Sequence, residues 1–450
     1  MFPLSICGLD AILVLLAVAL VFGRPIMRSA VDVAVIGAGP YGLSVAAHLS
    51  GHACEPRIFG RSMETWRSFM PKGMVLKSEG FAMSLSEPTG EYTLAAYCRD
   101  HSIPYQDVGW PVPLETFAAY GEAFQRRFVP QLEPFDVTRI ERSESGFDLQ
   151  LETGERLFAR HVVMATGIRP YSRLPDVLAD APGEKVTHSA EHGDMSQFEG
   201  RHVAVLGGGA SAMDVAAALH RAGATASVIT RRPDVRFYPP GSFRSMRDSL
   251  LAPMTPLGPG WKKYLCVKLP DLFHALPERT RIGIVNRYLG PSPAWSVRDI
   301  VQNHVDVRLN ATVTAAHVGN GTVTLSISKP GAGATTLDVD HVISATGYDI
   351  DIDRSTVLSE GLRKALGNGC GSPRLSPHFE SGVSGLYFVG TPAAMNFGPM
   401  LRFVCGAEFA ARRLSRHIAR RVAIADMADS APMPLRAVPF EDAARGSVRA

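Results

Sequence analysis

The sequence has little of what marks several large protein classes. Its few cysteines include no Cys-x-x-Cys pair, so a zinc site and a dithiol redox centre are both disfavoured. So few thiols in 450 residues are typical of a reducing compartment. Basic residues number 46 against 43 acidic ones, a net charge of +3, which argues against a nucleic-acid partner. The cysteines are Cys7, Cys54, Cys98, Cys266, Cys370 and Cys405.

Long apolar runs are also missing, with one short exception. Residues 11–23 are uninterrupted and apolar, with Asp10 before them and Arg24 and Arg28 after them. The run is shorter than the roughly 18–20 residues of a membrane span and lacks the basic region of a secretory signal. Two interpretations stay open: residues 1–30 are an extension with a weak anchor, or translation starts at Met27. We expect a cytoplasmic protein whose peripheral membrane attachment, if any, runs through residues 11–23 alone.

The first motif that carries chemistry begins after a β-branched run at residues 31–36. The sequence GAGPYG at 37–42 stands between this run and a helical pattern, which is the order strand, G-x-G-x-x-G, helix. Gly37 permits the tight turn, Gly39 lets backbone N–H groups approach a pyrophosphate, and Gly42 lets the helix pack on the strand. The positive end of the helix then faces the phosphates.

The same order repeats at residues 201–219. A strand at 201–206 precedes GGGASA, in which Ala212 replaces the last glycine, an accepted variant. The next strand ends at Arg231 and Arg232. Guanidinium groups at this position favour the 2′-phosphate of NADP over NAD; the alternative is that they are solvated charges at a strand end.

Each repeat is followed by the same pair of features. Residues 137–157 and 307–337 alternate like antiparallel hairpins, and each leads to a buried strand and an Ala-Thr-Gly turn, closing at Gly167 and Gly347. A late strand ends at Gly390. The duplication predicts an α/β fold with two Rossmann-like dinucleotide-binding domains and antiparallel hairpin insertions.

Over roughly residues 31–420, these motifs resemble the flavin-containing monooxygenases and their relatives, the Baeyer–Villiger and N-hydroxylating monooxygenases. The resemblance implies that the first loop binds FAD and the second binds NADPH. The expected domains are an FAD-binding domain (31–185 and 335–420), an NADPH-binding domain (186–334, with an insertion at 237–300) and a disordered tail (421–450). The cofactor-binding residues that the resemblance implies are Gly37, Gly39, Pro40, Tyr41, Gly42, Trp66, Gly167, Gly207, Gly209, Ser211, Ala212, Arg231, Arg232, Gly347, Gly390 and Gly398.

The resemblance also suggests three catalytic residues. His188 matches the histidine of a family fingerprint that is otherwise imperfect here, Lys77 stands where many members have asparagine, and Asn396 lies beside Gly398. Each has a plainer interpretation: a hinge residue, a solvated loop charge and a helix cap, respectively. His192 also has two interpretations, as a hinge residue or as a catalytic or NADP-orienting residue, and Asp214 either interacts with the helix dipole or contacts a cofactor.

One departure from the family concerns the FAD ribose. The acidic residue that usually ends the second strand is absent, since the strand runs into Gly60. Glu64 or Ser62 could substitute for it.

The activity implied is that of an NADPH-consuming FAD monooxygenase. It inserts one oxygen atom into a small organic substrate through a flavin hydroperoxide, needs no metal and has oxygen as its second substrate. The alternatives are an NAD(P)H-dependent flavin reductase or oxidase that passes electrons to a quinone, a partner protein or oxygen, and a non-catalytic nucleotide-binding protein. The same fold serves all three, so the motifs alone do not choose between them.

Overall fold

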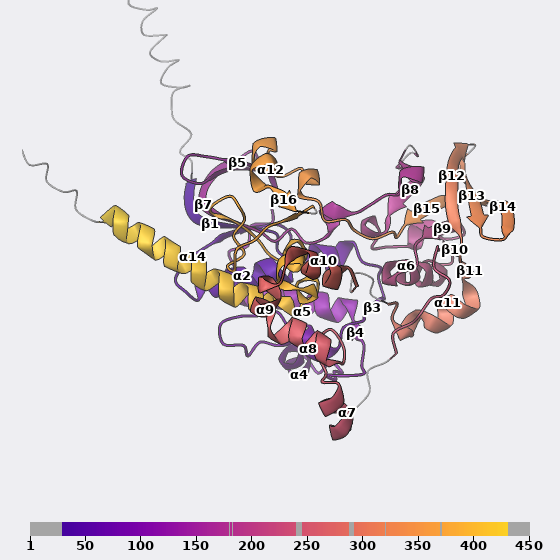
Figure 1. Cartoon of the computed structure of the whole chain (residues 1–450), viewed down its shortest axis with the longest axis horizontal. Helices are drawn as coiled ribbons and strands as arrows, with labels where there is room; N and C mark the ends of the chain where they lie inside the picture. Colours follow the sequence, from indigo (N-terminus) through magenta and orange to yellow (C-terminus); the bar gives the residue numbers. More distant parts are fainter. Residues whose placement is uncertain are drawn as a thin grey trace, which may run out of the picture.

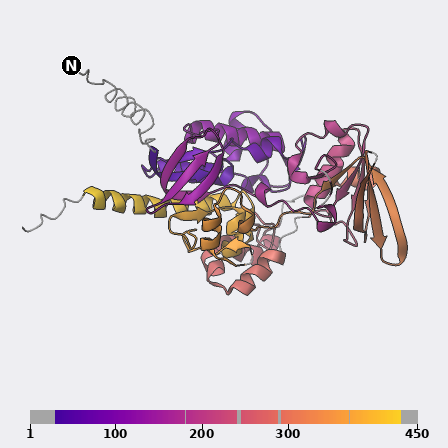
Figure 2. The same cartoon turned by 90° about the horizontal axis from the view of Figure 1, so that it is seen from above.

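The computed structural model describes residues 29–179, 181, 183–239, 245–287, 292–319, 321–369 and 371–430. The apolar run at 11–23 and residues 431–450 of the predicted tail therefore lie outside the described residues. Two α/β units lie side by side along the long axis of the molecule, the first built around β1 and the second around β9 (Figures 1 and 2). Their two connections run next to each other, with Ser172 bridged to Tyr348.

The first sheet combines parallel and antiparallel pairing around one long strand, β7. The first half of β7 pairs antiparallel with β6, and its second half pairs in parallel with β18. Strand β1 lies between β7 and β2, parallel to both. The predicted hairpin at 137–157 is therefore confirmed as β5 and β6 with the start of β7. The strands are β1 (Ser29–Ile36), β2 (Arg57–Phe59), β5 (Val137–Arg142), β6 (Phe147–Leu151), β7 (Arg156–Met164) and β18 (Leu386–Phe388).

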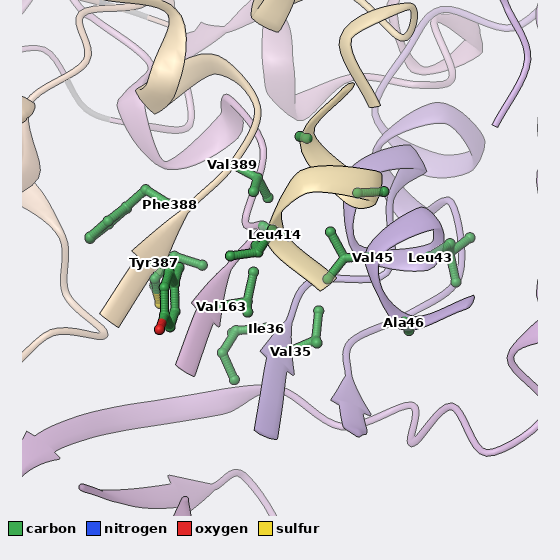
Figure 3. Close-up of a cluster of buried hydrophobic side chains, with 14 of the residues drawn as sticks. Val35, Ile36, Leu43, Val45, Ala46, Val163, Tyr387, Phe388, Val389 and Leu414 are labelled. Carbon is green, nitrogen blue, oxygen red and sulfur yellow. The ribbon is translucent and has the colours of Figure 1, made fainter. Parts of the chain in front are cut away.

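Helices from both ends of the chain cover this sheet. Figure 3 shows Val35 of β1, Val45 of α2 and Leu414 of α14 in one buried cluster. Helix α14 continues past residue 420, where the sequence analysis ended the folded chain, because Ile418 and Val422 remain buried one turn apart. The helices of this unit are α2 (Pro40–Ser50), α3 (Glu64–Ser68), α4 (Leu94–Asp100), α5 (Leu114–Phe128), α12 (Glu360–Leu366), α13 (Ala394–Phe397) and α14 (Gly406–Ser430).

The second sheet is wholly parallel, in the order β11-β10-β9-β15-β8. Successive residues of β9 point to opposite faces: Val203 and Val205 pack toward α6, whereas Ala204 and Leu206 pack toward the three-stranded sheet β12-β13-β14. The strands and helices are β8 (Val186–His188), β9 (His202–Leu206), α6 (Ala210–Arg221), β10 (Thr225–Ile229), α11 (Arg298–His304), β11 (Asp306–Arg308), β12 (Thr312–Gly319), β13 (Thr322–Lys329), β14 (Ala332–Val339) and β15 (His341–Ser344).

Parts of two segments lie in a different unit from the one the sequence suggested. Residues 335–420 were assigned to the FAD-binding domain, but β15 pairs with β9 and β8, because Val342 and Ile343 are buried between the layers of the second unit. The insertion at 237–300 was assigned to the NADPH-binding domain, yet Phe273 and Val285 join the core of the first unit. Its helices are α7 (Met246–Leu251), α8 (Trp261–Lys268), α9 (Pro270–Ala275) and α10 (Glu278–Arg287).

Candidate dinucleotide-binding site

The first glycine loop, residues 37–42, lies between β1 and α2. Gly37 has a φ of +110°, and a Cβ added there would lie 2.4 Å from the carbonyl oxygen of Ala165. A Cβ at Gly42 would lie 1.8 Å from the carbonyl oxygen of Gly37. At Gly39, by contrast, nothing lies within 4 Å of an added Cβ. The packing of the protein itself therefore requires Gly37 and Gly42, whereas Gly39 leaves an open side where a phosphate can approach.

Tyr41 and Pro40 shape the loop from the inside. Pro40 is buried in the first turn of α2, where the missing N–H costs nothing. The Tyr41 hydroxyl donates to the carbonyl oxygen of Phe403 at 2.8 Å, and its ring lies 3.5 Å from a Cβ added at Gly390. Burial raises the pKa of Tyr41 well above its usual value. Tyr41 thus ties the first loop to the segment that precedes α14.

The end of β2 shows which group could replace the absent acidic residue. Gly60 has a φ of +120° and places the chain against Ala38. Glu64 is engaged by arginines, lying 4.0 Å from Arg61 and 3.6 Å from Arg169. The Oγ atom of Ser62 is buried and has no hydrogen-bond partner among the described residues. Because a buried hydroxyl is normally paired, Ser62 has a hydrogen-bonding position open, whereas Glu64 is already engaged.

A cleft of about 720 Å³ opens beside the second glycine loop. A Cβ at Gly207, where φ is +147°, would lie 2.4 Å from the carbonyl oxygen of Ala345, whereas a Cβ at Gly209 meets nothing within 4 Å. This is the same division of roles as in the first loop. Ser211, in the first turn of α6, also lines the cleft, and Ala212 is fully buried behind it.

The lining of this cleft is strongly cationic. Among the described residues it contains four arginines and no aspartate or glutamate. Such a surface is complementary to an anionic ligand with several phosphates. Two of the four, Arg231 and Arg232, were predicted; the sequence analysis missed Arg173 and Arg402.

Arg402 is half-buried, and two of its three guanidinium nitrogens lack a hydrogen-bond partner among the described residues. These two atoms, Nε and Nη1, are themselves buried. Burial lowers the pKa of its guanidinium. Leaving such a group unsatisfied is costly, and an anion in the cleft would remove this cost. A signal was present in the sequence: Arg402 interrupts the apolar run that follows Gly398.

The two Ala-Thr-Gly turns have positive backbone angles, with a φ of +71° at Gly167 and +91° at Gly347. Nothing lies within 4 Å of a Cβ added at either glycine. Gly347 lines the cleft, and its carbonyl oxygen accepts from the N–H of Arg173 at 3.2 Å.

His188 contacts the main chain through both ring nitrogens. Its Nε2 lies 3.1 Å from the carbonyl oxygen of Gly347, and its Nδ1 accepts from the N–H of Ala190 at 3.1 Å. Burial lowers the pKa of His188, so the neutral ring that both bonds require is favoured. The nearby His192 is similarly engaged, with Thr187 and Gln197. The geometry fits a residue that positions the Gly347 turn.

Asn396 likewise uses its whole amide on the backbone. Its Oδ1 accepts from the N–H of Leu375 at 3.1 Å, and its Nδ2 donates to the carbonyl oxygen of Pro373 at 2.9 Å. Gly398 has a φ of +99°, and a Cβ there would lie 3.4 Å from the ring of Phe273. Asn396 thus holds the backbone beside the expected flavin site. Trp66, on α3, packs edge-on against Phe117 with ring centroids 4.7 Å apart.

Lys77 lies where the two units meet. It follows β3 (Val75–Leu76), and its ammonium lies 5.2 Å from the ring centroid of Tyr238, which follows the second glycine loop in the chain. Burial lowers the pKa of Lys77 to about 8, against the opposing effect of Asp214 on α6. Burial raises the pKa of Asp214 to about 7. Burial thus moves the pKa of Lys77 and the pKa of Asp214 toward neutral pH.

Two further absences concern the described residues alone. No cluster of three or more His, Cys, Asp or Glu side chains there has the arrangement to hold a metal ion. No helix in that part of the chain is both long and apolar enough to cross a membrane.

Comparison with known proteins agrees with this architecture. Residues 34–240 match the family described as pyridine nucleotide-disulphide oxidoreductase. Indole-3-pyruvate monooxygenase YUCCA1 of Oryza sativa subsp. japonica is 29% identical over 212 residues, 44% of this chain and 47% of that protein. Probable indole-3-pyruvate monooxygenase YUCCA3 of Arabidopsis thaliana is 24% identical over 405 residues, 84% and 86% of the two chains. The first alignment thus spans about half of that relative's length.

Two other matches are a shorter sequence alignment with a reductase and a superposition with a solved structure. A ferredoxin–NADP reductase of Symbiobacterium thermophilum is 36% identical over 104 residues, 22% of this chain and 30% of that protein. The solved structure of an ornithine hydroxylase from Pseudomonas aeruginosa superposes with a TM-score of 0.69, covering 87% of this chain and all of that one at 17% identity. The chain therefore has the fold of the two-dinucleotide-domain flavin monooxygenases, resembles the pyridine nucleotide-disulphide oxidoreductase family over residues 34–240, and is similar in sequence to flavin-dependent monooxygenases.

Proposed function

We propose that this protein is an NADPH-dependent FAD monooxygenase that inserts one oxygen atom of O₂ into a small organic substrate. The observation that carries the proposal is the cleft of about 720 Å³ beside the second glycine loop, with four arginines and no carboxylate in its lining. NADPH, with a pyrophosphate and a 2′-phosphate, matches that lining. The first glycine loop, with its open side at Gly39 and the unpaired Ser62 hydroxyl, fits FAD.

In this proposal the two cofactors use different sets of residues. FAD contacts the first loop, Trp66, Gly167, Gly390 and Gly398, with Ser62 at its ribose. NADPH contacts the second loop, Ser211 and Gly347, with Arg231 and Arg232 at the 2′-phosphate and Arg402 at a phosphate oxygen. Bound FAD would supply the hydride acceptor and the oxygen chemistry.

The three catalytic candidates then have distinct tasks. Lys77, the catalytic residue of the three, changes charge near pH 8 and moves a proton at the junction of the two units. His188 positions Gly347, and Asn396 positions the backbone at 373–375. Both act through the main chain, because their polar atoms are already engaged there.

The second candidate is a flavin reductase that passes electrons to a partner protein. The ferredoxin–NADP reductase match favours it, but that alignment covers only 30% of that protein. The alignment with a probable indole-3-pyruvate monooxygenase spans 86% of that relative. The monooxygenase is therefore the better supported of the two.

Isotope labelling separates these functions. The purified full chain is assayed for bound FAD, for NADPH oxidation, and for transfer of ¹⁸O from ¹⁸O₂ to amines, sulfides and ketones. We expect one labelled oxygen atom per product molecule. NADPH oxidation with every electron recovered in peroxide or in reduced ferredoxin would establish the reductase instead. A protein that binds neither cofactor would be a non-catalytic member of the fold.

A further inference from the structure

The helical segment α7–α9 exposes a concentrated set of apolar side chains. The described part of the chain has thirteen large hydrophobic residues that are strongly exposed, and six of them fall within residues 250–272. Exposed large apolar groups gathered on one face mark interaction sites. We call this set the apolar face; its members are Leu250, Leu251, Trp261, Leu265, Leu269 and Leu272.

The apolar face is continuous across three helices. Trp261 and Leu265 are four residues apart and so lie on one side of α8, and Leu269 stands between the end of α8 and the start of α9. The Trp261 ring N–H donates to the carbonyl oxygen of Leu250 at 3.1 Å, which joins the end of α7 to the start of α8. In Figure 1, α7 projects from the molecule below α8 and α9.

The opposite side of α8 and α9 is buried in the protein core. Cys266 and Phe273 are buried in the core of the first unit, and the Phe273 ring packs against Gly398. The outward direction of the apolar face is therefore set by buried contacts on the other side. Leu265 is 47% exposed and Leu272 is 58% exposed, although each lies on a helix whose other side is buried.

Basic residues are interspersed with the apolar ones. Lys262 and Lys268 are exposed on α8, and neither has an ion pair among the described residues. The nearby acid Asp271 is already paired with Arg413. A helix surface with tryptophan and leucine beside free lysines is typical of helices that lie in a membrane interface and bind anionic lipids. The buried core of a protein–protein interface is instead depleted in lysine.

We propose that the apolar face docks onto membranes that carry anionic headgroups. Trp261 and the leucines enter the interfacial layer, and Lys262 and Lys268 contact the headgroups. This surface is additional to residues 11–23, the only attachment that the sequence suggested. The proposal does not depend on the proposed oxygenation reaction.

Vesicle binding tests the proposal with the flavin-loaded full chain. Co-sedimentation is measured with vesicles of phosphatidylcholine alone and with vesicles that also contain phosphatidylserine. We expect preferential binding to the anionic vesicles, and we expect Leu265→Glu combined with Leu269→Glu to weaken it by about tenfold or more. Leu265→Ala with Leu269→Ala should weaken it less, and Lys262→Glu with Lys268→Glu should remove the preference for phosphatidylserine.

The control variant places the same two negative charges on α14. Ile424 and Met427 on α14 are 62% and 65% exposed, so Ile424→Glu with Met427→Glu should bind vesicles as the parent does. Equal binding by the Leu265→Glu, Leu269→Glu variant would overturn the proposal and assign attachment to another segment. The proposal is also wrong if the parent does not bind vesicles but forms a dimer, and the Leu265→Glu, Leu269→Glu variant is a monomer. The apolar face would then be a self-association surface. NADPH oxidation in solution reports on the proposed function separately.

Discussion

The unpartnered guanidinium of Arg402 leads to a prediction with two effects of opposite sign. Arg402→Met replaces a half-buried cation with an apolar side chain of similar length. Without dinucleotide, the change removes a buried group that has no hydrogen-bond partner at Nε or Nη1. Such a group costs about 1–3 kcal/mol, so the free energy of unfolding should stay the same or rise by up to this amount.

Binding of NADP⁺ should change in the opposite direction. Arg402 lines the cleft beside the second glycine loop, where a phosphate oxygen would accept its hydrogen bond. A hydrogen bond to a charged group contributes about 1.5–3 kcal/mol. At 1.4 kcal/mol for each factor of ten, the dissociation constant should rise by about 10- to 150-fold.

Calorimetric titration of the FAD-loaded protein with NADP⁺, and urea unfolding without added NADP⁺, measure the two effects. Arg139→Met is the control, because Arg139 is exposed and, in the described part of the chain, forms an ion pair with the exposed Glu141 alone, so both quantities should stay close to those of the parent. A variant at Arg402 that loses several kcal/mol of stability and binds NADP⁺ like the parent would refute the reasoning. Arg402 would then support the fold and not the ligand.

Three other predictions concern the same site. Gly39→Ala should fold like the parent, since its Cβ meets nothing within 4 Å, but should retain about tenfold less FAD. Gly42→Ala should instead be destabilised, because its Cβ would lie 1.8 Å from the carbonyl oxygen of Gly37. Flavin absorbance after gel filtration and urea unfolding measure the two effects, and equal FAD content in Gly39→Ala and the parent contradicts the prediction. Arg231→Gln with Arg232→Gln should raise KM for NADPH by about 10- to 100-fold and leave KM for NADH unchanged; a parallel rise for both would mean that neither arginine reads the 2′-phosphate. Burial lowers the pKa of Lys77 to about 8, so between pH 8 and pH 10 the unfolded chain binds more protons and the parent should gain stability, by at most about 3 kcal/mol. Lys77→Met should lose that rise in urea midpoint, and an identical pH slope in both proteins would show that Lys77 is not desolvated.

Short stretches of the sequence were enough to predict several secondary-structure elements of this protein. The strand–glycine–helix order at 31–50 and 201–219 was readable because chain direction, turn geometry and helix packing constrain neighbouring residues. The antiparallel hairpins at 137–157 and 307–337 were readable for the same reason, since alternation and turn glycines are short-range signals. These features sufficed for the fold class.

Only the tertiary structure showed which segments of the chain pack in which of the two units. Strand β15 joins the second sheet, and Phe273 joins the first core, although each lies in a segment that the sequence assigned to the other unit. Hydrophobic burial depends on which surface a segment meets, and local pattern carries no information about that surface. Helix α14 likewise continues past residue 420, because Val422 is buried in the core of the first unit.

The candidate site shows the same division between local and long-range information. The sequence alone determined where the backbone can approach a phosphate, because glycine conformation is a local property. It could not show that the Asn396 amide and the Nε2 atom of His188 hydrogen-bond to backbone groups more than twenty residues away, or that Nε and Nη1 of Arg402 have no partner among the described residues. Such long-range hydrogen bonds depend on how distant segments pack together, and for that reason only the tertiary structure showed which of these polar side chains are already engaged.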